Sequence, residues 1–237
     1  MQITKKKLKA WNACKAGYEY FLDKFRAGEA PYQEVLDALA QDDHVEWAKW
    51  LIGKAGPDKD AIFNAASISN IENFFFSGWI SVGKISISGF LLAGCGIKAG
   101  KGISAGKGIS AGYAIEAGED IEAGEGIKAG EGISVGYAIE AGEGISAGYA
   151  IEAGEGIIAG EGIKAGKGIS AGYAIEAGKG IIAGEGISAG EDIEAGEDYG
   201  IFAGLEIPIA KWALHSSVIA KNKPLNLVSG SWSEVGA

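Results

Sequence analysis

Histidine, the side chain best suited to acid–base chemistry near neutral pH, occurs only twice in this 237-residue chain, as His44 and His215. The regular middle of the sequence, residues 97–193, contains none, so it lacks the nitrogen ligands that zinc prefers. We expect His44 to be a solvent-facing helix residue and His215 to be structural. We therefore predict a protein that is not an enzyme, with no catalytic residue, no metal site and no cofactor.

Three other patterns imitate chemical sites. The segment GKGISAGKG, residues 100–108, resembles a phosphate-binding loop, but no register places four residues between a first glycine and Gly-Lys-Ser/Thr. Carboxylates are abundant, yet the calcium-binding nonapeptide repeat needs aspartate at a fixed place, and here glutamate occupies variable places. Cys14 and Cys95 lie in different regions, so we expect two buried, reduced thiols and no disulfide.

Isoleucine at every sixth position, from Ile97 to Ile193, gives the architecture. Each unit reads Ile-x-Ala-Gly, so Ile and Ala would share one face of a short strand while x takes the other. We expect the glycine to form the corner because it accepts a positive φ. Three units would close a triangular coil of 18 residues, and the coils would stack by parallel strand pairing with isoleucine ladders inside.

These repeats resemble the hexapeptide-repeat family of parallel β-helices, which is of the left-handed type, over about half of the chain. In that family the small inward residue usually precedes the large one, whereas here isoleucine comes first. The chain also resembles uncharacterised bacterial and prophage proteins that join a short helical head, here LKAWNACKAGYEYFLDKF, to IxAG repeats. Acyltransferases and zinc carbonic anhydrases of the hexapeptide type carry histidines on their coils, and the resemblance therefore implies neither activity here.

Composition divides the chain into four parts. We predict a small α-helical module over residues 1–56, with Thr4 capping its first helix and Asp42 or Asp43 its last. Residues 57–84 would form a linker and irregular first coils, residues 85–198 the repeats, and residues 199–237 a C-terminal cap with strand character. Residues 73–96 have the length of a membrane span, but Lys84 lies at its centre, so we expect coils there. The predicted fold class is mainly β, a single-stack parallel β-helix behind a helical head.

Outward residues eighteen apart would share one wall of the rod. One wall is dominated by carboxylates, which we predict to bind a partner: Glu122, Glu125, Glu140, Glu143, Glu161, Glu176, Glu194 and Glu197. A second wall is also acidic, and the third is nearly neutral. On the third wall Tyr113, Tyr149 and Ile182 are a candidate self-association surface. In the helical head Trp11, Trp47 and Trp50 are a candidate contact with a partner.

A net charge of −10 disfavours direct binding of nucleic acid and favours either a basic partner or simple solubility. The N-terminus lacks the apolar run of a secretory signal, so we expect a cytoplasmic protein. The leading hypothesis is a phage- or prophage-encoded inhibitor that mimics DNA and occupies the nucleic-acid groove of a basic host protein, such as CRISPR or restriction machinery. One alternative is a self-assembling structural rod, which would be a homo-oligomer; another is a small-ligand binder or enzyme with sites between subunits.

Overall fold

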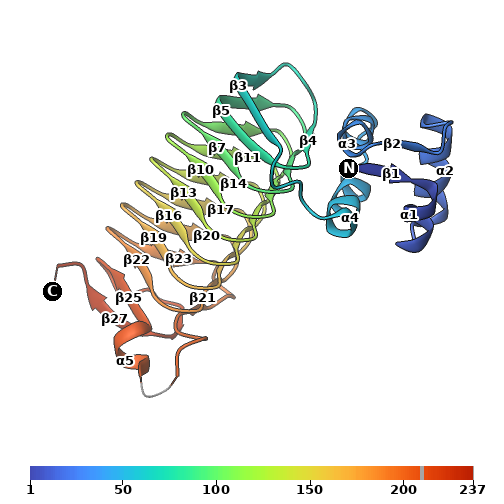
Figure 1. Ribbon diagram of the computed structural model, residues 1–237. Helices are drawn as coiled ribbons and strands as arrows, with labels where there is room; N and C mark the ends of the chain where they lie inside the picture. The colour runs from blue at the N-terminus through green and yellow to red at the C-terminus, as the bar shows by residue number, and fades with distance from the viewer. Residues whose placement is uncertain (209–210, 237) are drawn as a thin grey trace.

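The computed structural model describes residues 1–208 and 211–236, without the side chains of residues 213 and 214. A parallel β-solenoid fills the chain from residue 62 onward, and a helical head lies beside its first coils (Figure 1). The predicted fold class, a mainly β parallel solenoid behind a small helical module, is confirmed.

The head contains four helices, α1 (Lys5–Ala10), α2 (Lys15–Lys24), α3 (Tyr32–Gln41) and α4 (Val45–Ala55). Strand β1 (Gln2–Thr4) pairs antiparallel with β2 (Glu29–Pro31) and ties the two halves of the head together. As predicted, Thr4 caps the first helix, because its Oγ1 accepts a hydrogen bond of 3.2 Å from the Lys7 N–H. Buried apolar side chains from every helix, such as Leu8, Phe21, Leu36 and Leu51, form the core of the head.

Two expectations about the head are wrong. Neither Asp42 nor Asp43 caps α4; the N-cap is His44, whose side chain makes no capping bond, and Asp43 takes a left-handed φ of 55°. Cys14 is exposed, not buried, because it is the N-cap of α2 and its Sγ accepts a hydrogen bond of 3.4 Å from the Gly17 N–H. Cys95 is buried as expected, and burial raises the pKa of its thiol.

The solenoid starts with the longer strands β3 (Ile62–Ser69) and β5 (Trp79–Ile87), with β4 (Phe74–Phe76) and β6 (Leu91–Ala93) between and after them. From β7 to β23, each strand is one Ile-x-Ala or Ile-x-Val triplet. These are β7 (Ile97–Ala99), β8 (Ile103–Ala105), β9 (Ile109–Ala111), β10 (Ile115–Ala117), β11 (Ile121–Ala123), β12 (Ile127–Ala129), β13 (Ile133–Val135), β14 (Ile139–Ala141), β15 (Ile145–Ala147), β16 (Ile151–Ala153), β17 (Ile157–Ala159), β18 (Ile163–Ala165), β19 (Ile169–Ala171), β20 (Ile175–Ala177), β21 (Ile181–Ala183), β22 (Ile187–Ala189) and β23 (Ile193–Ala195).

Strands eighteen residues apart pair in parallel, so the predicted coil length is confirmed; Ile121, for example, lies opposite Ile139. Three walls result. We name them the glutamate wall (β8, β11, β14, β17, β20, β23), the mixed wall (β7, β10, β13, β16, β19, β22) and the neutral wall (β6, β9, β12, β15, β18, β21), each with the corner that follows it. Isoleucine and alanine point inward and are buried along all three walls, and the residue between them points outward.

The corner glycines are needed for a reason other than the one expected. Among the described residues, glycines with positive φ are Gly28, Gly56, Gly204, Gly230 and Gly236, and none belongs to a regular coil. In the coils, the glycine after each triplet except Gly100 lies directly over the backbone of the coil before it. A Cβ on Gly124, for example, would overlap the carbonyl oxygen of Gly106. Close stacking of coils, and not backbone conformation, therefore excludes a side chain there.

The C-terminal segment continues two walls. Strands β24 (Ile201–Phe202) and β26 (Leu227–Ser229) extend the neutral wall, and β25 (Ser217–Ala220) and β27 (Ser231–Glu234) extend the mixed wall. A short helix, α5 (Trp212–His215), lies between β24 and β25. The described part of the chain has no helix with the length and apolar character to cross a membrane. Residues 73–96, which imitate a span in sequence, form β4, β5 and β6.

Candidate functional site

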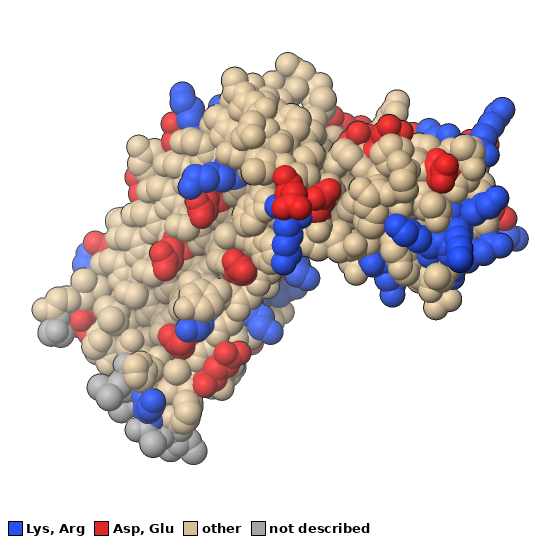
Figure 2. Space-filling view, in the orientation of Figure 1, with Lys and Arg blue, Asp and Glu red and all other residues tan. Residues whose placement is uncertain are grey.

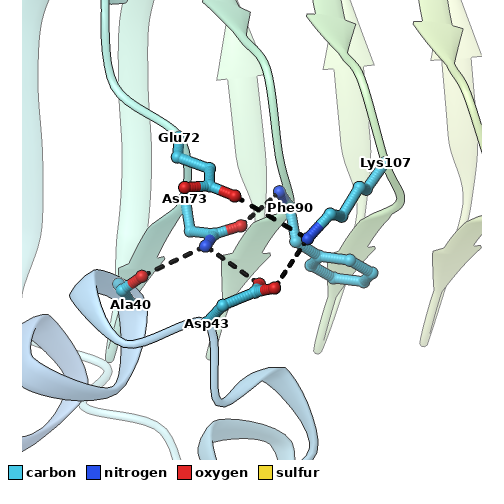
Figure 3. Close-up of polar contacts among 6 residues, drawn as sticks. All are labelled: Ala40, Asp43, Glu72, Asn73, Phe90 and Lys107. Carbon is cyan, nitrogen blue, oxygen red and sulfur yellow. Dashed lines mark hydrogen bonds and ion pairs between the residues drawn. The ribbon is translucent and has the colours of Figure 1, made fainter.

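Asn73 is the polar centre of the junction that fixes the head to the solenoid (Figure 3). Its Nδ2 donates to the carbonyl oxygen of Ala40 and to Oδ1 of Asp43, both at 3.1 Å. Its Oδ1 accepts a hydrogen bond of 2.7 Å from the backbone N–H of Phe90, in the second coil. Since Asn73 is only 8% exposed, these three bonds replace water at a nearly closed contact.

Lys107 joins the same junction from the first corner of the glutamate wall. Its Nζ lies 2.8 Å from Oδ2 of Asp43 and 3.9 Å from Oε1 of Glu72. The hydrogen bond from the Lys107 ammonium, helped by the one from Asn73, holds the pKa of the Asp43 carboxyl below its usual value. The same contact with Asp43 raises the pKa of Lys107. The left-handed backbone of Asp43 thus serves the junction instead of a helix cap.

Gln33 of α3 acts as a substitute strand for β4. Its Nε2 donates to the Phe75 carbonyl at 2.8 Å, and its Oε1 accepts from the Ser77 N–H at 3.0 Å. Both backbone groups lie along the outer edge of β4, the strand that pairs with β6 at the start of the neutral wall, and no earlier coil among the described residues pairs with them there. The head therefore satisfies that edge with one side-chain amide, which also holds α3 over the solenoid.

The outward residues of the glutamate wall form a strand row. Glu122 and Glu140 lie directly opposite each other in register, as do Glu176 and Glu194. Ile158 stands between the two pairs and is 42% exposed. Neighbouring carboxylates in this row are therefore roughly 4.8 Å apart at the backbone, the spacing of adjacent strands.

A corner row runs beside the strand row. The backbone N–H of each member bonds to the carbonyl of the one before it, from Lys107 through Glu125, Glu143 and Glu161 to Lys179. Lysines end the row on both sides, and Lys179 forms a 2.6 Å ion pair with Glu161. Glu125 and Glu143 remain as the carboxylates of this row without an ion pair among the described residues.

The predicted acidic set is not uniform along the wall. Four members, which we call the acidic patch, form two rows across two neighbouring coils: Glu122, Glu125, Glu140 and Glu143. The other four lie farther along, with Glu161 paired to Lys179, Glu176 and Glu194 beyond Ile158, and Glu197 in a widened turn. The acidic patch thus places four carboxylates, without ion pairs among the described residues, on two neighbouring coils.

More of the carboxylates on the mixed wall than on the glutamate wall form ion pairs with lysines. Lys98 bonds Glu116 at 2.8 Å across one coil, and Lys221 bonds Glu191 at 2.6 Å. Asp120 accepts a hydrogen bond of 2.9 Å from the backbone of the next coil. Sequence counting placed similar numbers of acids on both walls, and only the pairing within each wall distinguishes them.

The candidate self-association residues are placed apart from one another. Tyr113 stacks on Trp79, with 5.6 Å between the ring centroids. Tyr149 lies two coils away in the same corner row, with Lys167 Nζ 4.4 Å from its ring centroid. Ile182 belongs to the strand row of the neutral wall. The structure thus offers three separate side chains there and not a continuous apolar patch.

In the head, Trp47 and Trp50 line a cavity of about 220 Å³ between α1, α2, α3 and α4. Gly17 and the exposed Cys14 stand at its wall. Trp11, the third candidate, ends α1 and packs half-buried on the head core, outside the cavity lining. All three tryptophans pack against the head core, and no sequence pattern marked the cavity itself.

Charge is divided unevenly between the two parts of the molecule. Residues 1–60 contain ten basic and ten acidic residues, so the net charge of −10 comes from the solenoid. Figure 2 shows basic side chains gathered over the far end of the head, where α1 and α2 lie. Within the described residues, no group of three or more histidine, cysteine or carboxylate side chains is arranged to hold a metal ion.

Comparison with known proteins identifies the head alone. Residues 1–55 match the model of a family described as the YdhT N-terminal domain. The match ends at the last residue of α4, before the first strand of the solenoid. No curated protein and no solved structure gives a significant match to the chain.

Proposed function

We propose that the protein is a non-catalytic interaction protein whose acidic patch binds a basic surface of another protein. The observation that carries this is the two-by-two arrangement of Glu122, Glu125, Glu140 and Glu143 on a rigid scaffold, without ion pairs among the described residues. Like charges one strand spacing apart destabilise the fold, and a lysine in either row would remove that cost. The mixed wall uses lysines in this way at Glu116 and Glu191.

The partner we propose is a nucleic-acid-handling protein of a bacterial host, and the chain would be phage- or prophage-encoded and belong to the hexapeptide-repeat type. Rows of carboxylates at constant spacing resemble the phosphates of a duplex in sign and regularity, so the patch would mimic DNA and inhibit a defence protein such as CRISPR or restriction machinery. A cytoplasmic location follows from this proposal. Charge steering would make association fast and sensitive to salt.

The test is capture of partners from bacterial lysate with three tagged forms of the protein. The first is the wild type, and the second carries Glu→Lys at Glu122, Glu125, Glu140 and Glu143. The third is the matched control with the same charge change on the mixed wall, at Glu116, Glu119, Glu152 and Glu155. We expect the wild type and the control to retain a nucleic-acid-handling protein at low salt, and the patch variant to lose it. Equal capture by all three folded forms would refute the proposal.

A further inference from the structure

The last strand of the mixed wall presents an open edge. Strand β27 pairs with β25 in register, Val218 opposite Trp232, and ends the sheet among the described residues. The Ser231 N–H donates to the Ser216 carbonyl at 2.9 Å, so the backbone groups of Ser231 point toward β25. Because successive residues of a strand alternate, the N–H and C=O groups of Trp232 and Glu234 point to the free edge.

Exposed apolar side chains occur in β27 and elsewhere in the last segment of the chain. Trp232 lies in register with an inward column, Ile187 and then Val218, and it is 37% exposed. Three other apolar residues lie exposed in the same last segment of the chain. We call the four the C-terminal tip: Leu225 (100% exposed), Val228 (63%), Trp232 (37%) and Val235 (43%).

At the opposite end of the solenoid the head covers the edge of β4, whereas β3 ends the other sheet and pairs with β5 alone among the described strands. Gln33 already pairs with the outer edge of β4, and the head lies beside that end of the stack. A further coil from another molecule would have to displace Gln33 to stack on the neutral wall there. The C-terminal tip has no such cover among the residues that the structure describes.

The distribution of charge also favours the C-terminal tip as the contact between two copies. Side-by-side contact through either acidic wall would bring like charges together, which is unfavourable, and the neutral wall offers no continuous apolar patch for such a contact. Residues 199–237 contain three lysines and two glutamates, so this segment is close to neutral. An open strand edge next to exposed apolar side chains is a template for another strand, and a copy of itself is complementary to it by two-fold symmetry.

We propose that the C-terminal tip is a homodimer interface, in which β27 pairs antiparallel with β27 of a second copy. The two solenoids then meet tail to tail, with both heads outermost and both acidic patches exposed. This inference does not depend on the proposed function of the patch. Being isologous, the contact closes at two copies and does not extend into a filament.

The first test is the mass in solution, by light scattering over a concentration series. The wild type is expected to approach twice the chain mass of 24.3 kDa. Glu234→Pro removes the N–H at the free edge of both copies and leaves the bonds to β25 in place. We therefore expect the dissociation constant of the dimer to rise about tenfold. Glu234→Ala keeps that N–H and should dimerise like the wild type. Ile158 lies on the glutamate wall and is 42% exposed, close to the 43% of Val235 in the tip. Ile158→Glu should also leave the dimer intact.

The second test reports which ends meet. Ser233→Cys in a Cys14→Ser background should be joined to its copy by a short bis-maleimide, whereas wild-type Cys14, in the head, should not. Wild type that stays monomeric at every concentration overturns the proposal, as does growth beyond two copies. Crosslinking through Cys14 but not through Ser233→Cys would overturn it as well, because the heads would then form the contact.

Discussion

At the scale of single residues, the two glycines of one corner have different roles. A Cβ on Gly130 would overlap the carbonyl oxygen of Gly112 in the preceding coil, whereas a Cβ on Gly132 would approach no non-neighbouring atom closer than the Ala150 carbonyl, at 3.4 Å. The sequence agrees, because Ala114 and Ala150 occupy the position of Gly132 in the neighbouring coils. Glycine is therefore required for stacking at the position of Gly130 and is only preferred at the position of Gly132.

This difference predicts opposite results for two alanine substitutions two residues apart. Gly130→Ala should lower the free energy of unfolding by about 1–3 kcal/mol, because the coils must separate to fit the methyl group. Gly132→Ala should be neutral or slightly stabilising, because it restricts the unfolded chain without a clash. Denaturant unfolding of the two variants and the wild type measures both. Equal destabilisation by the two alanines would contradict this account of the corner.

Gln33 allows a second prediction at the residue scale. Gln33→Ala leaves the Phe75 carbonyl and the Ser77 N–H without their partner at a partly buried edge, which should cost about 1–3 kcal/mol of unfolding free energy. Gln33→Glu is the informative companion, because a carboxylate still accepts from Ser77 but would face the Phe75 carbonyl and the Asp37 carboxylate, to which Gln33 now donates; we expect a loss at least as large as that of Gln33→Ala. If Gln33→Ala unfolds like the wild type, the amide is not a substitute strand.

At the scale of elements, the sequence period predicted the coil but not how the head is attached. Ile-x-Ala every six residues is a local signal, and it correctly located the strands from β7 to β23 and their inward faces. The junction instead joins residues distant in sequence, such as Asn73 with Ala40 and Lys107 with Asp43, and no local pattern marks such pairs. The same limit explains the acidic patch, since charge counting found its wall but not which carboxylates lack a lysine.

The junction should respond to pH through Asp43 and Lys107. The pKa of Asp43 is lowered in the folded state, so its contribution is present above its unfolded pKa, about 3.9, and is lost as the pH falls through the folded value. The pKa of Lys107 is raised, so its contribution is complete below about 10.4 and is lost as the pH rises through the folded value. Between about pH 3.9 and pH 10.4, the charged forms of Asp43 and Lys107 both stabilise the folded state.

Lys107→Met tests this, because methionine keeps an apolar stem but removes the charge. The pKa of Asp43 should return toward its ordinary value, so the unfolding free energy of the variant should fall less steeply than that of the wild type below about pH 5. Denaturant unfolding at a series of pH values measures the two slopes. Parallel curves for the two proteins would show that the Lys107–Asp43 contact does not stabilise the junction.

At the scale of the whole molecule, a nearly neutral head is fixed to an acidic solenoid whose tip is again close to neutral. The junction holds the head against the first coils, and the glutamate wall begins there with Lys107. The acidic patch follows within the next coils, so its distance from the head is set by strand stacking. A partner that binds the patch would therefore meet a rigid surface, with little conformational entropy to lose on binding.

The most direct measurement is competition between this protein and duplex DNA for the partner captured by the acidic patch. We expect DNA to displace the wild-type protein, the displacement to be mutual, and the Glu→Lys patch variant neither to bind nor to compete. We also expect the affinity of the partner for the wild type to fall steeply as salt rises. A partner that holds DNA and this protein at the same time, with unchanged affinity for each, would contradict the central claim that the glutamate rows take the place of phosphates.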